Sequence, residues 1–105
     1  MRWRLVPMAA CTALALAVGC SDGSGVDGGE LFATHCAGCH PKGGNTIRPE
    51  KTLARAHRES NGIRTARDVA AYIRNPGPGM PAFGEGMIPP ADALKIGEYV
   101  VVSFP

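Results

Sequence analysis

The sequence predicts an all-α domain of four to five short helices and no sheet. Residues that cap helices precede several segments, and the apolar residues within those segments recur at helical spacing. The β-branched run at residues 100–102 has no evident partner strand elsewhere in the 105-residue chain. A chain of this length holds one small domain, which we place at residues 29–105.

The first helix is expected after Asp27, an N-cap residue that has Glu30 three positions later as its capping-box partner. Residues 20–28 consist mainly of Gly, Ser and Asp, and they are predicted to form a flexible linker. We expect Phe32 in the core and His35 on the surface. The side chains that fall on one side of this helix are Leu31, Phe32, His35 and Cys36.

The second and third helices are predicted to be short. Thr52 is expected to cap the second one, which Asn61 and the glycine after it stop. Thr65 and Asp68 begin the third, which ends at Asn75 because the residue before a proline is pushed out of helical geometry. Its apolar stripe is formed by Val69, Tyr72 and Ile73.

Residues 76–83 are predicted to form a rigid, extended loop, because they are rich in proline and glycine. The last helix is expected to open near Pro89 and Pro90, since proline is tolerated in a first turn. One face of this helix is predicted to carry Leu94, Gly97 and Val101, with Ala93 and Val100 beside them.

Residues 1–19 have the features of a lipoprotein signal peptide, with two arginines followed by an apolar stretch too short to span a membrane comfortably. The segment that ends at Cys20 resembles a bacterial lipobox, so Cys20 is predicted to carry lipid after cleavage. In similar lipoproteins an aspartate after the cysteine favours the inner membrane; here the residue is Ser21, which favours the outer membrane. Ordinary cleavage nearby, leaving Cys20 as a free thiol, is the alternative.

The motif CAGCH at residues 36–40 predicts one covalently bound haem c. The thiols of Cys36 and Cys39 each add across a vinyl group of the porphyrin, and the imidazole of His40 binds the iron. A zinc site would need a second ligand pair, and a redox CxxC would need a preceding strand in a βαβ unit; the chain has neither. The large apolar side chains available to surround the haem are few, namely Leu31, Phe32, Leu53, Ile73, Phe83 and Leu94.

Met80 is predicted to bind the iron on its other side, since a methionine thioether is a common ligand in c-type cytochromes. It lies forty residues after His40, between prolines that restrict the backbone and glycines that permit close approach to the porphyrin. Met87 lacks this frame and is expected to be a packing residue, but it stays the second candidate ligand. His57 is the remaining polar group for the distal side, and nothing rigid in the sequence holds it.

On these motifs the chain resembles class I c-type cytochromes, and in particular the cytochrome c6 group. The resemblance covers residues 28–104 and includes the stretches at 43–53 and 80–84 as well as the haem motif. It implies the class I cytochrome c fold, with its helices wrapped around the haem. It also implies a loop carbonyl between Asn45 and Pro49 that bonds the second ring nitrogen of His40.

The resemblance further implies that the first and last helices cross closely, with Gly29 and Phe32 against Gly97 and Tyr99. The lipobox and the segment from residue 58 to 78 depart from soluble c6 proteins. They are more similar to the c6-like lipoprotein cytochromes of the outer membrane in metal-reducing bacteria.

Two filled axial positions leave no place for a substrate on the iron. We therefore expect a single-electron carrier in periplasmic or outer-membrane respiration, and not an enzyme. The alternatives are a haem protein with a labile sixth site, such as a gas sensor or peroxidase-like enzyme, and a structural lipoprotein. The expected partners are other redox proteins, such as cytochromes, oxidases or reductases, and the lipid bilayer through Cys20.

We expect a monomer, exported and anchored at the periplasmic face, and we favour the outer over the inner membrane. Charge is unevenly distributed, because residues 42–74 carry eight basic side chains against three acidic ones. A basic side on an electron carrier can steer an acidic partner, although a solvated face that selects nothing is the alternative. Nothing else in the sequence supports nucleic-acid binding.

Overall fold

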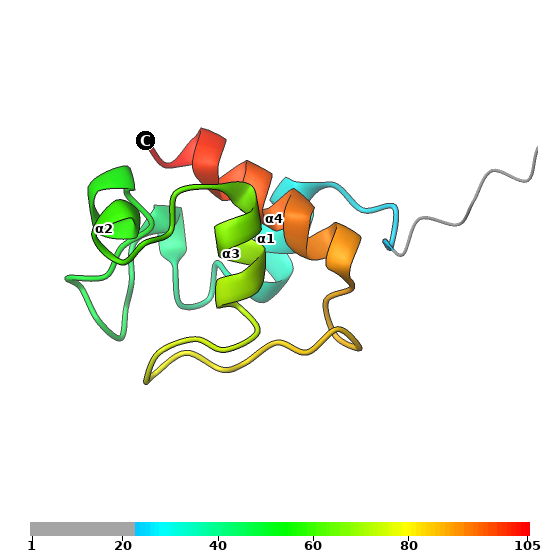
Figure 1. Ribbon diagram of the computed structural model, residues 1–105, viewed down its shortest axis with the longest axis horizontal. Helices are drawn as coiled ribbons and strands as arrows, with labels where there is room; N and C mark the ends of the chain where they lie inside the picture. The colour runs from blue at the N-terminus through cyan, green and yellow to red at the C-terminus, as the bar shows by residue number, and fades with distance from the viewer. Residues whose placement is uncertain (1–22) are drawn as a thin grey trace, which may run out of the picture.

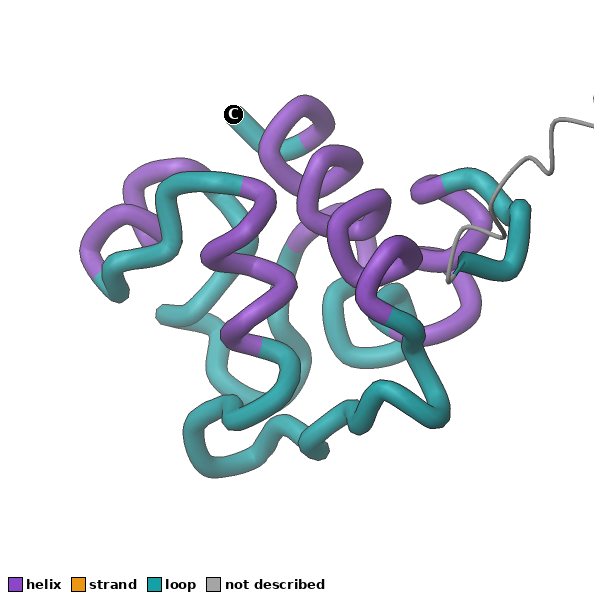
Figure 2. Tube along the Cα trace, turned by 45° about the vertical axis from the view of Figure 1, so that its right-hand side comes forward, coloured by secondary structure: helices purple, strands orange, loops and turns teal. Residues whose placement is uncertain are grey.

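The computed structural model describes residues 23–105, and Cys20 with the predicted signal peptide lies outside them. Within the described part the chain is helical and has no strand, as predicted (Figures 1 and 2). None of its helices is long and apolar enough to cross a membrane. The elements are α1 (Gly28–His35), the 3₁₀ turn η1 (Pro41–Gly43), α2 (Arg55–Ser60), α3 (Ala66–Tyr72) and α4 (Pro90–Ser103).

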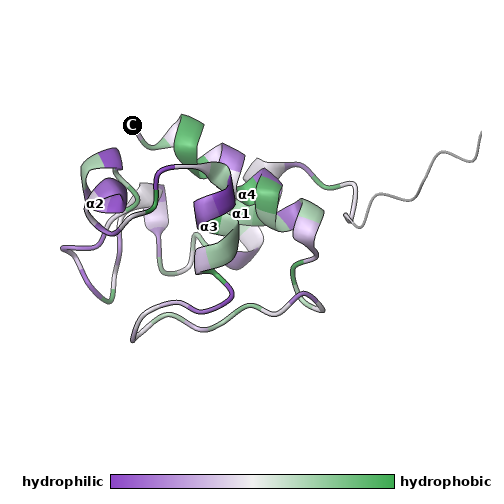
Figure 3. Cartoon of the chain, viewed as in Figure 1, coloured by the Kyte–Doolittle hydropathy of each residue, from purple (hydrophilic) through white to green (hydrophobic). Residues whose placement is uncertain are grey.

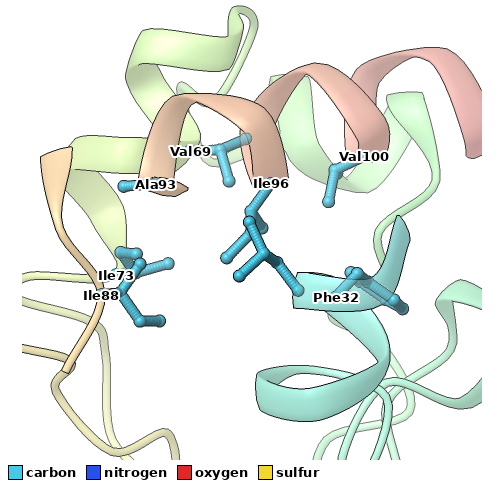
Figure 4. Packing of buried hydrophobic residues seen from close by; sticks show 8 residues of the cluster. Phe32, Val69, Ile73, Ile88, Ala93, Ile96 and Val100 are labelled. Atoms are coloured by element: carbon cyan, nitrogen blue, oxygen red, sulfur yellow. The ribbon is translucent and has the colours of Figure 1, made fainter. Parts of the chain in front are cut away.

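Helix α4 is the centre of the fold, because both α1 and α3 pack against it. The core lies where these three helices meet, and Ile88 and Ile96 are its most completely buried large side chains (Figure 4). The core residues are Leu31, Phe32, Val69, Ile73, Ile88, Ala93, Ile96 and Val100.

Two of the predicted helix starts are confirmed by their hydrogen bonds. The carboxylate of Asp27 accepts from the backbone N–H of Glu30 at 2.9 Å and so caps α1. At α3, Thr65 Oγ1 accepts from the N–H of Asp68, and the Asp68 carboxylate accepts from the N–H of Thr65, which completes a capping box. Helix α3 ends at Tyr72, about one turn before the predicted end.

The predicted start of the second helix was wrong. Helix α2 begins at Arg55, two residues later than expected, and Ala54 at its N-cap position has no capping side chain. Thr52 is engaged elsewhere: its backbone N–H donates to His57 Nδ1 at 3.1 Å, and its hydroxyl lies 2.7 Å from the same nitrogen. A contact with His57, five residues along the chain and within α2, therefore replaces the expected cap.

The predicted face of α4 was rotated by about one residue. Leu94 is one of the exposed large apolar residues, whereas Ala93 and Ile96 are almost completely buried. Residues 100–102 are helical, as expected. The buried apolar positions follow the i, i+3, i+4, i+7 pattern of a helix face that packs against a core, and they are Ala93, Ile96, Gly97 and Val100.

The close crossing of α1 and α4 is confirmed, with Gly29 and Phe32 against Tyr99 as expected, but Gly97 takes no part in it. Gly28 lies against the backbone of Lys95, and the rings of Phe32 and Tyr99 are 5.2 Å apart. Gly97 instead faces the backbone of Ala66 at the start of α3, where a Cβ would collide with the carbonyl oxygen. Gly28 of α1 and Gly97 of α4 thus each permit one close contact, the first between α1 and α4 and the second between α3 and α4.

Candidate functional site

A single deep cleft collects the residues that the sequence singled out. Cys36, Cys39, His40 and Met80 all line it. The open space within it, including its mouth, is about 1120 Å³. Its inner wall is apolar and includes Phe32, Leu53, Ile63, Val69, Ile73, Phe83, Ile96 and Val100.

The segment from Cys36 to His40 leaves the end of α1 as a hydrogen-bonded turn. The N–H of His40 donates to the carbonyl of Cys36 at 2.9 Å, and the N–H of Thr46 donates to the carbonyl of Cys39 at 2.9 Å. These bonds hold both cysteine side chains and the histidine on the same wall of the cleft.

The imidazole of His40 is fixed by its own loop. Its Nδ1 lies 2.7 Å from the carbonyl oxygen of Gly44, which can only accept, so Nδ1 carries the hydrogen and Nε2 has its lone pair free. The expected carbonyl lay between residues 45 and 49, and the observed one comes just before that range. The reason is η1, a turn that the sequence did not predict and that brings Gly44 back under the ring.

Gly43 is the residue that makes this turn possible. Its φ of +79° is in the region that favours glycine, and a Cβ there would collide with the ring of Phe104. Its carbonyl accepts from the N–H of Leu53 at 2.8 Å and ties the loop to the next segment.

Burial also affects the first cysteine. Removal from water raises the pKa of the Cys36 thiol to about 11, because the apolar wall disfavours the thiolate. Neither Cys36 nor Cys39 forms a disulfide with a described residue, so both sulfur atoms are available for thioether bonds to the vinyl groups.

The distal loop, residues 76–83, is held at its ends. The Tyr72 hydroxyl accepts from the N–H of Gly77 at 3.2 Å, and the N–H of Phe83 donates to the carbonyl of Ile73 at 2.8 Å. Between these points Gly79 has a φ of +91°, and Met80 turns toward the core and is half-buried.

Met87 is placed differently, and its prediction as a packing residue was wrong. It is 62% exposed and does not line the cleft. Its position follows the turn at residues 84–88, which buries Ile88 instead.

One side of the cleft is polar and basic. Arg48, Lys51 and Arg58 line it, together with His57 and Asn61, and no Asp or Glu from the described residues does. Arg58 is only 4% exposed; its Nε donates to the carbonyl of Leu53 at 2.7 Å, and one Nη donates to that of Phe104 at 3.1 Å.

Sequence reasoning missed both Arg58 and the support of His57. Thr52 holds the ring of His57 through Nδ1, contrary to the expectation that nothing rigid holds this side chain. No local pattern indicates that a helical arginine is buried, because its partners are backbone carbonyls and one of them lies 46 residues away.

The residues present fit a haem. A haem has a large apolar ring, two vinyl groups and two propionates; the cleft has an apolar wall, two thiols at CxxC spacing, and a cationic side free of carboxylates. The charge of this side complements the propionates, and burial of the ring adds apolar contact to a small core.

Comparisons with known proteins agree with this fit. Residues 24–100 match the family model described as cytochrome c oxidase, cbb3-type, subunit III. The chain is a c6-like class I c-type cytochrome. It is 36% identical to cytochrome c6 of Bumilleriopsis filiformis over 75 residues, which are 71% of this chain and 86% of that protein.

Solved structures of this cytochrome family match as well. OmcF, the outer-membrane cytochrome F of Geobacter sulfurreducens, is 90% identical, with a TM-score of 0.74 over 74% of this chain and 99% of that one. Cytochrome c6 of the diatom Phaeodactylum tricornutum is 33% identical, with a TM-score of 0.67 over 72% and 88%. The expected fold class is therefore confirmed.

Membership in this family establishes the cofactor and the coarse function. Cytochromes of the c6 type carry one covalently bound haem c and transfer electrons to other redox proteins. They are electron carriers and not enzymes, in agreement with the sequence-based expectation.

Proposed function

We propose that this cytochrome is a single-electron carrier whose haem iron is bound by His40 and Met80, with thioether links at Cys36 and Cys39. The observation that carries the proposal is the state of His40: its Nδ1 is committed to Gly44, so Nε2 is the nitrogen presented for a metal. Met80, the one half-buried methionine of the described residues that lines the same cleft, supplies the second ligand.

When bound, a c-type haem stores one electron by alternation of its iron between two oxidation states. The chain supplies the conditions for fast transfer. His40 and Met80 would remain the ligands of the iron in both oxidation states. The apolar wall around Phe32 and Ile73 excludes water, so little has to rearrange when an electron is gained or lost. The thioether ligand favours a high reduction potential.

The anchor and the location are part of the same proposal. We infer that Cys20 carries lipid and holds the protein at the periplasmic face of the outer membrane, where it serves respiratory electron transfer as a monomer. The signal peptide, the lipobox-like segment and the position of Ser21 support this. The similarity to OmcF, which is named as an outer-membrane cytochrome, also favours this location.

Spectra of the purified holoprotein test the ligands. We expect a low-spin spectrum with an iron–sulfur charge-transfer band that is lost in Met80→Ala and kept in Met87→Ala, the matched control with an exposed side chain. Ready binding of carbon monoxide by the ferrous wild-type protein would instead support a labile sixth site, of the gas-sensor or peroxidase-like kind.

Mass spectrometry of the membrane fraction tests the anchor. We expect the mature chain to begin at Cys20 and to carry the mass of attached acyl chains. The variant Cys20→Ser should be released in soluble form, and an unmodified wild-type chain would contradict the anchor but leave the haem ligands unaffected.

A further inference from the structure

His57 lines the polar side of the haem cleft from α2, the strongly hydrophilic helix of Figure 3. Its side chain is half-buried, and its ring is held at one nitrogen alone. The backbone N–H of Thr52 lies 3.1 Å from Nδ1, and the Thr52 hydroxyl lies 2.7 Å from the same atom. The other nitrogen, Nε2, makes no hydrogen bond with a described residue.

These contacts decide which ring nitrogen carries the hydrogen. A backbone N–H can only donate, so Nδ1 of His57 is the acceptor and the hydrogen of the neutral ring lies on Nε2. The hydroxyl agrees with this assignment. Thr52 Oγ1 accepts from the N–H of Ala54 at 3.3 Å, which leaves the hydrogen of the hydroxyl free to point at Nδ1.

The two histidines on which the cleft depends are therefore held in opposite tautomers. In His40 the hydrogen is on Nδ1 and the lone pair of Nε2 is free, which suits a metal. In His57 the free nitrogen is the one that carries the hydrogen, so it can donate a hydrogen bond but cannot bind iron. Held in this way, His57 is suited to an acceptor such as a carboxylate.

The acceptors that the protein itself offers on this side are already used. The two carbonyls that Arg58 reaches are taken by its guanidinium, and Asn45 Nδ2 takes the carbonyl of Lys51 at 2.9 Å. Asn45 Oδ1 accepts from two backbone N–H groups. No Asp or Glu of the described residues lines the cleft, whereas a haem brings two carboxylates to it. A half-buried donor without a partner is costly, and a propionate would supply the partner.

We propose that His57 is a haem-binding residue that donates from Nε2 to a propionate of the haem, and that Thr52 is the positioning residue that keeps it in the donor tautomer. As a neutral donor, His57 stabilises the carboxylate without adding another positive charge to this side of the cleft. The proposal rests on the haem of the proposed carrier, but it depends neither on ligation by Met80 nor on lipid at Cys20.

The tautomer is tested in the ferrous, low-spin wild-type holoprotein, whose diamagnetic iron permits ¹⁵N NMR of the imidazole rings. At neutral pH we expect the hydrogen of His57 on Nε2. It should exchange with water roughly fivefold slower than the ring hydrogen of His35, which also lines the cleft but makes no hydrogen bond with a described residue. A hydrogen on Nδ1 of His57 would overturn the proposal.

The role of Thr52 is tested by variants of that residue. Thr52→Val removes one of the two donors to Nδ1, and we expect the Nε2 hydrogen of His57 to exchange roughly fivefold faster. Thr52→Ser keeps the hydroxyl and should restore the slow exchange. Equal exchange in the wild type and in Thr52→Val would show that Thr52 does not position the ring.

The carboxylate is tested with haem labelled with ¹³C at its two propionate carboxyl carbons. In His57→Leu we expect one of the two carboxyl signals to shift and the reduction potential to fall, because a carboxylate without its donor favours the more positive ferric state. His57→Gln keeps a neutral donor and should restore both. Ser60→Ala is the matched control: Ser60 is exposed, bonds the His57 carbonyl and does not line the cleft, so neither readout should change.

The outcomes separate this proposal from that of the iron ligands. Carboxyl signals that stay unchanged in His57→Leu would show that the donor faces water, and a shift that His57→Gln does not restore would show an effect of packing; either result overturns the role of His57. The iron–sulfur band, recorded on the same samples, reports on Met80 alone. Its absence from the wild type would overturn ligation by Met80 and leave the assignment of His57 to its own tests.

Discussion

The two walls of the haem cleft hold their predicted ligands in different ways. On the proximal wall the bonds reach the ligand itself: the backbone N–H of His40 is bonded to Cys36, and its ring to Gly44. On the distal wall the bonds hold the ends of the loop, and Met80 has only a long 3.4 Å bond from its N–H to the carbonyl of Gly77. His40 is 9% exposed, whereas Met80 is only half-buried.

This difference indicates how the site should fail. The proximal ligand is held by its own segment, so its loss requires the local fold to unfold. The distal ligand depends on α3, because the loop is attached to Tyr72, Ile73 and Arg74 at the end of that helix. Moderate damage should therefore release Met80 first and leave His40 in place.

The largest expected effect comes from a change that breaks the proximal wall. Gly43→Ala places a Cβ at a positive φ and against the ring of Phe104, and we expect a loss of about 3 kcal/mol in the free energy of unfolding. Thermal or denaturant unfolding of the holoprotein measures it. Gly38→Ala, where a Cβ meets nothing within 4 Å, should leave the stability nearly unchanged.

A smaller loss is expected from Arg58→Met, which keeps a long side chain but leaves the carbonyls of Leu53 and Phe104 without their partner. Loss of these two part-buried, charge-assisted hydrogen bonds costs about 2 kcal/mol. The reduction potential should also fall, because a cation beside the cleft disfavours the more positive ferric state. Arg67→Met, an exposed arginine on α3, is the control. An unchanged potential in Arg58→Met would show that the guanidinium does not act on the haem.

The contrast between the walls also marks what the sequence could predict. Short-range chemistry was predictable: the haem motif, the caps at Asp27 and Thr65, and the long last helix depend on residues close together in the chain. The position of Met80 in the cleft was predictable as well, since the prolines around it restrict the backbone before any packing occurs.

Competition between possible partners explains the errors, and at Thr52 it is local. Thr52 bonds the ring of His57, five residues along the chain, and does not cap a helix that starts at residue 53. Leu94 and Ile96 are both apolar and two residues apart, and only contact with α1 and α3 decides which of them is buried. The burial of Arg58 depends on the chain end at Phe104, 46 residues away, and local periodicity contains no information about it.

The distal wall can be weakened alone with Tyr72→Phe, which removes the hydroxyl that accepts from Gly77. Loss of one such hydrogen bond costs about 1 kcal/mol, and we expect it as easier release of Met80 rather than as global unfolding. The iron–sulfur charge-transfer band should vanish at a lower temperature than in the wild type, while the haem stays buried and bound to His40.

Tyr99→Phe is the matched control for this experiment, because the Tyr99 hydroxyl makes no hydrogen bond to any other described residue. Equal shifts of the band in the two variants would contradict the role given to Tyr72. A band that disappears only together with the fold would contradict the comparison of the two walls itself.

The smallest effect expected is a dependence of the distal wall on acid, through the cap of α3. The N–H groups of Arg64 and Thr65 donate to Asp68 and lower its pKa below the ordinary 3.8, so its stabilising effect is complete above that value and is lost as pH falls through the lowered pKa. Protonation weakens the start of the helix that supports the distal loop.

In acid the iron–sulfur band should therefore weaken before α1 unfolds. The variant Asp68→Asn, which cannot ionise, should reduce this pH dependence. Glu85→Gln, which removes a carboxylate on the exposed loop after Phe83, should preserve it; if both variants respond to acid as the wild type does, the cap does not control Met80.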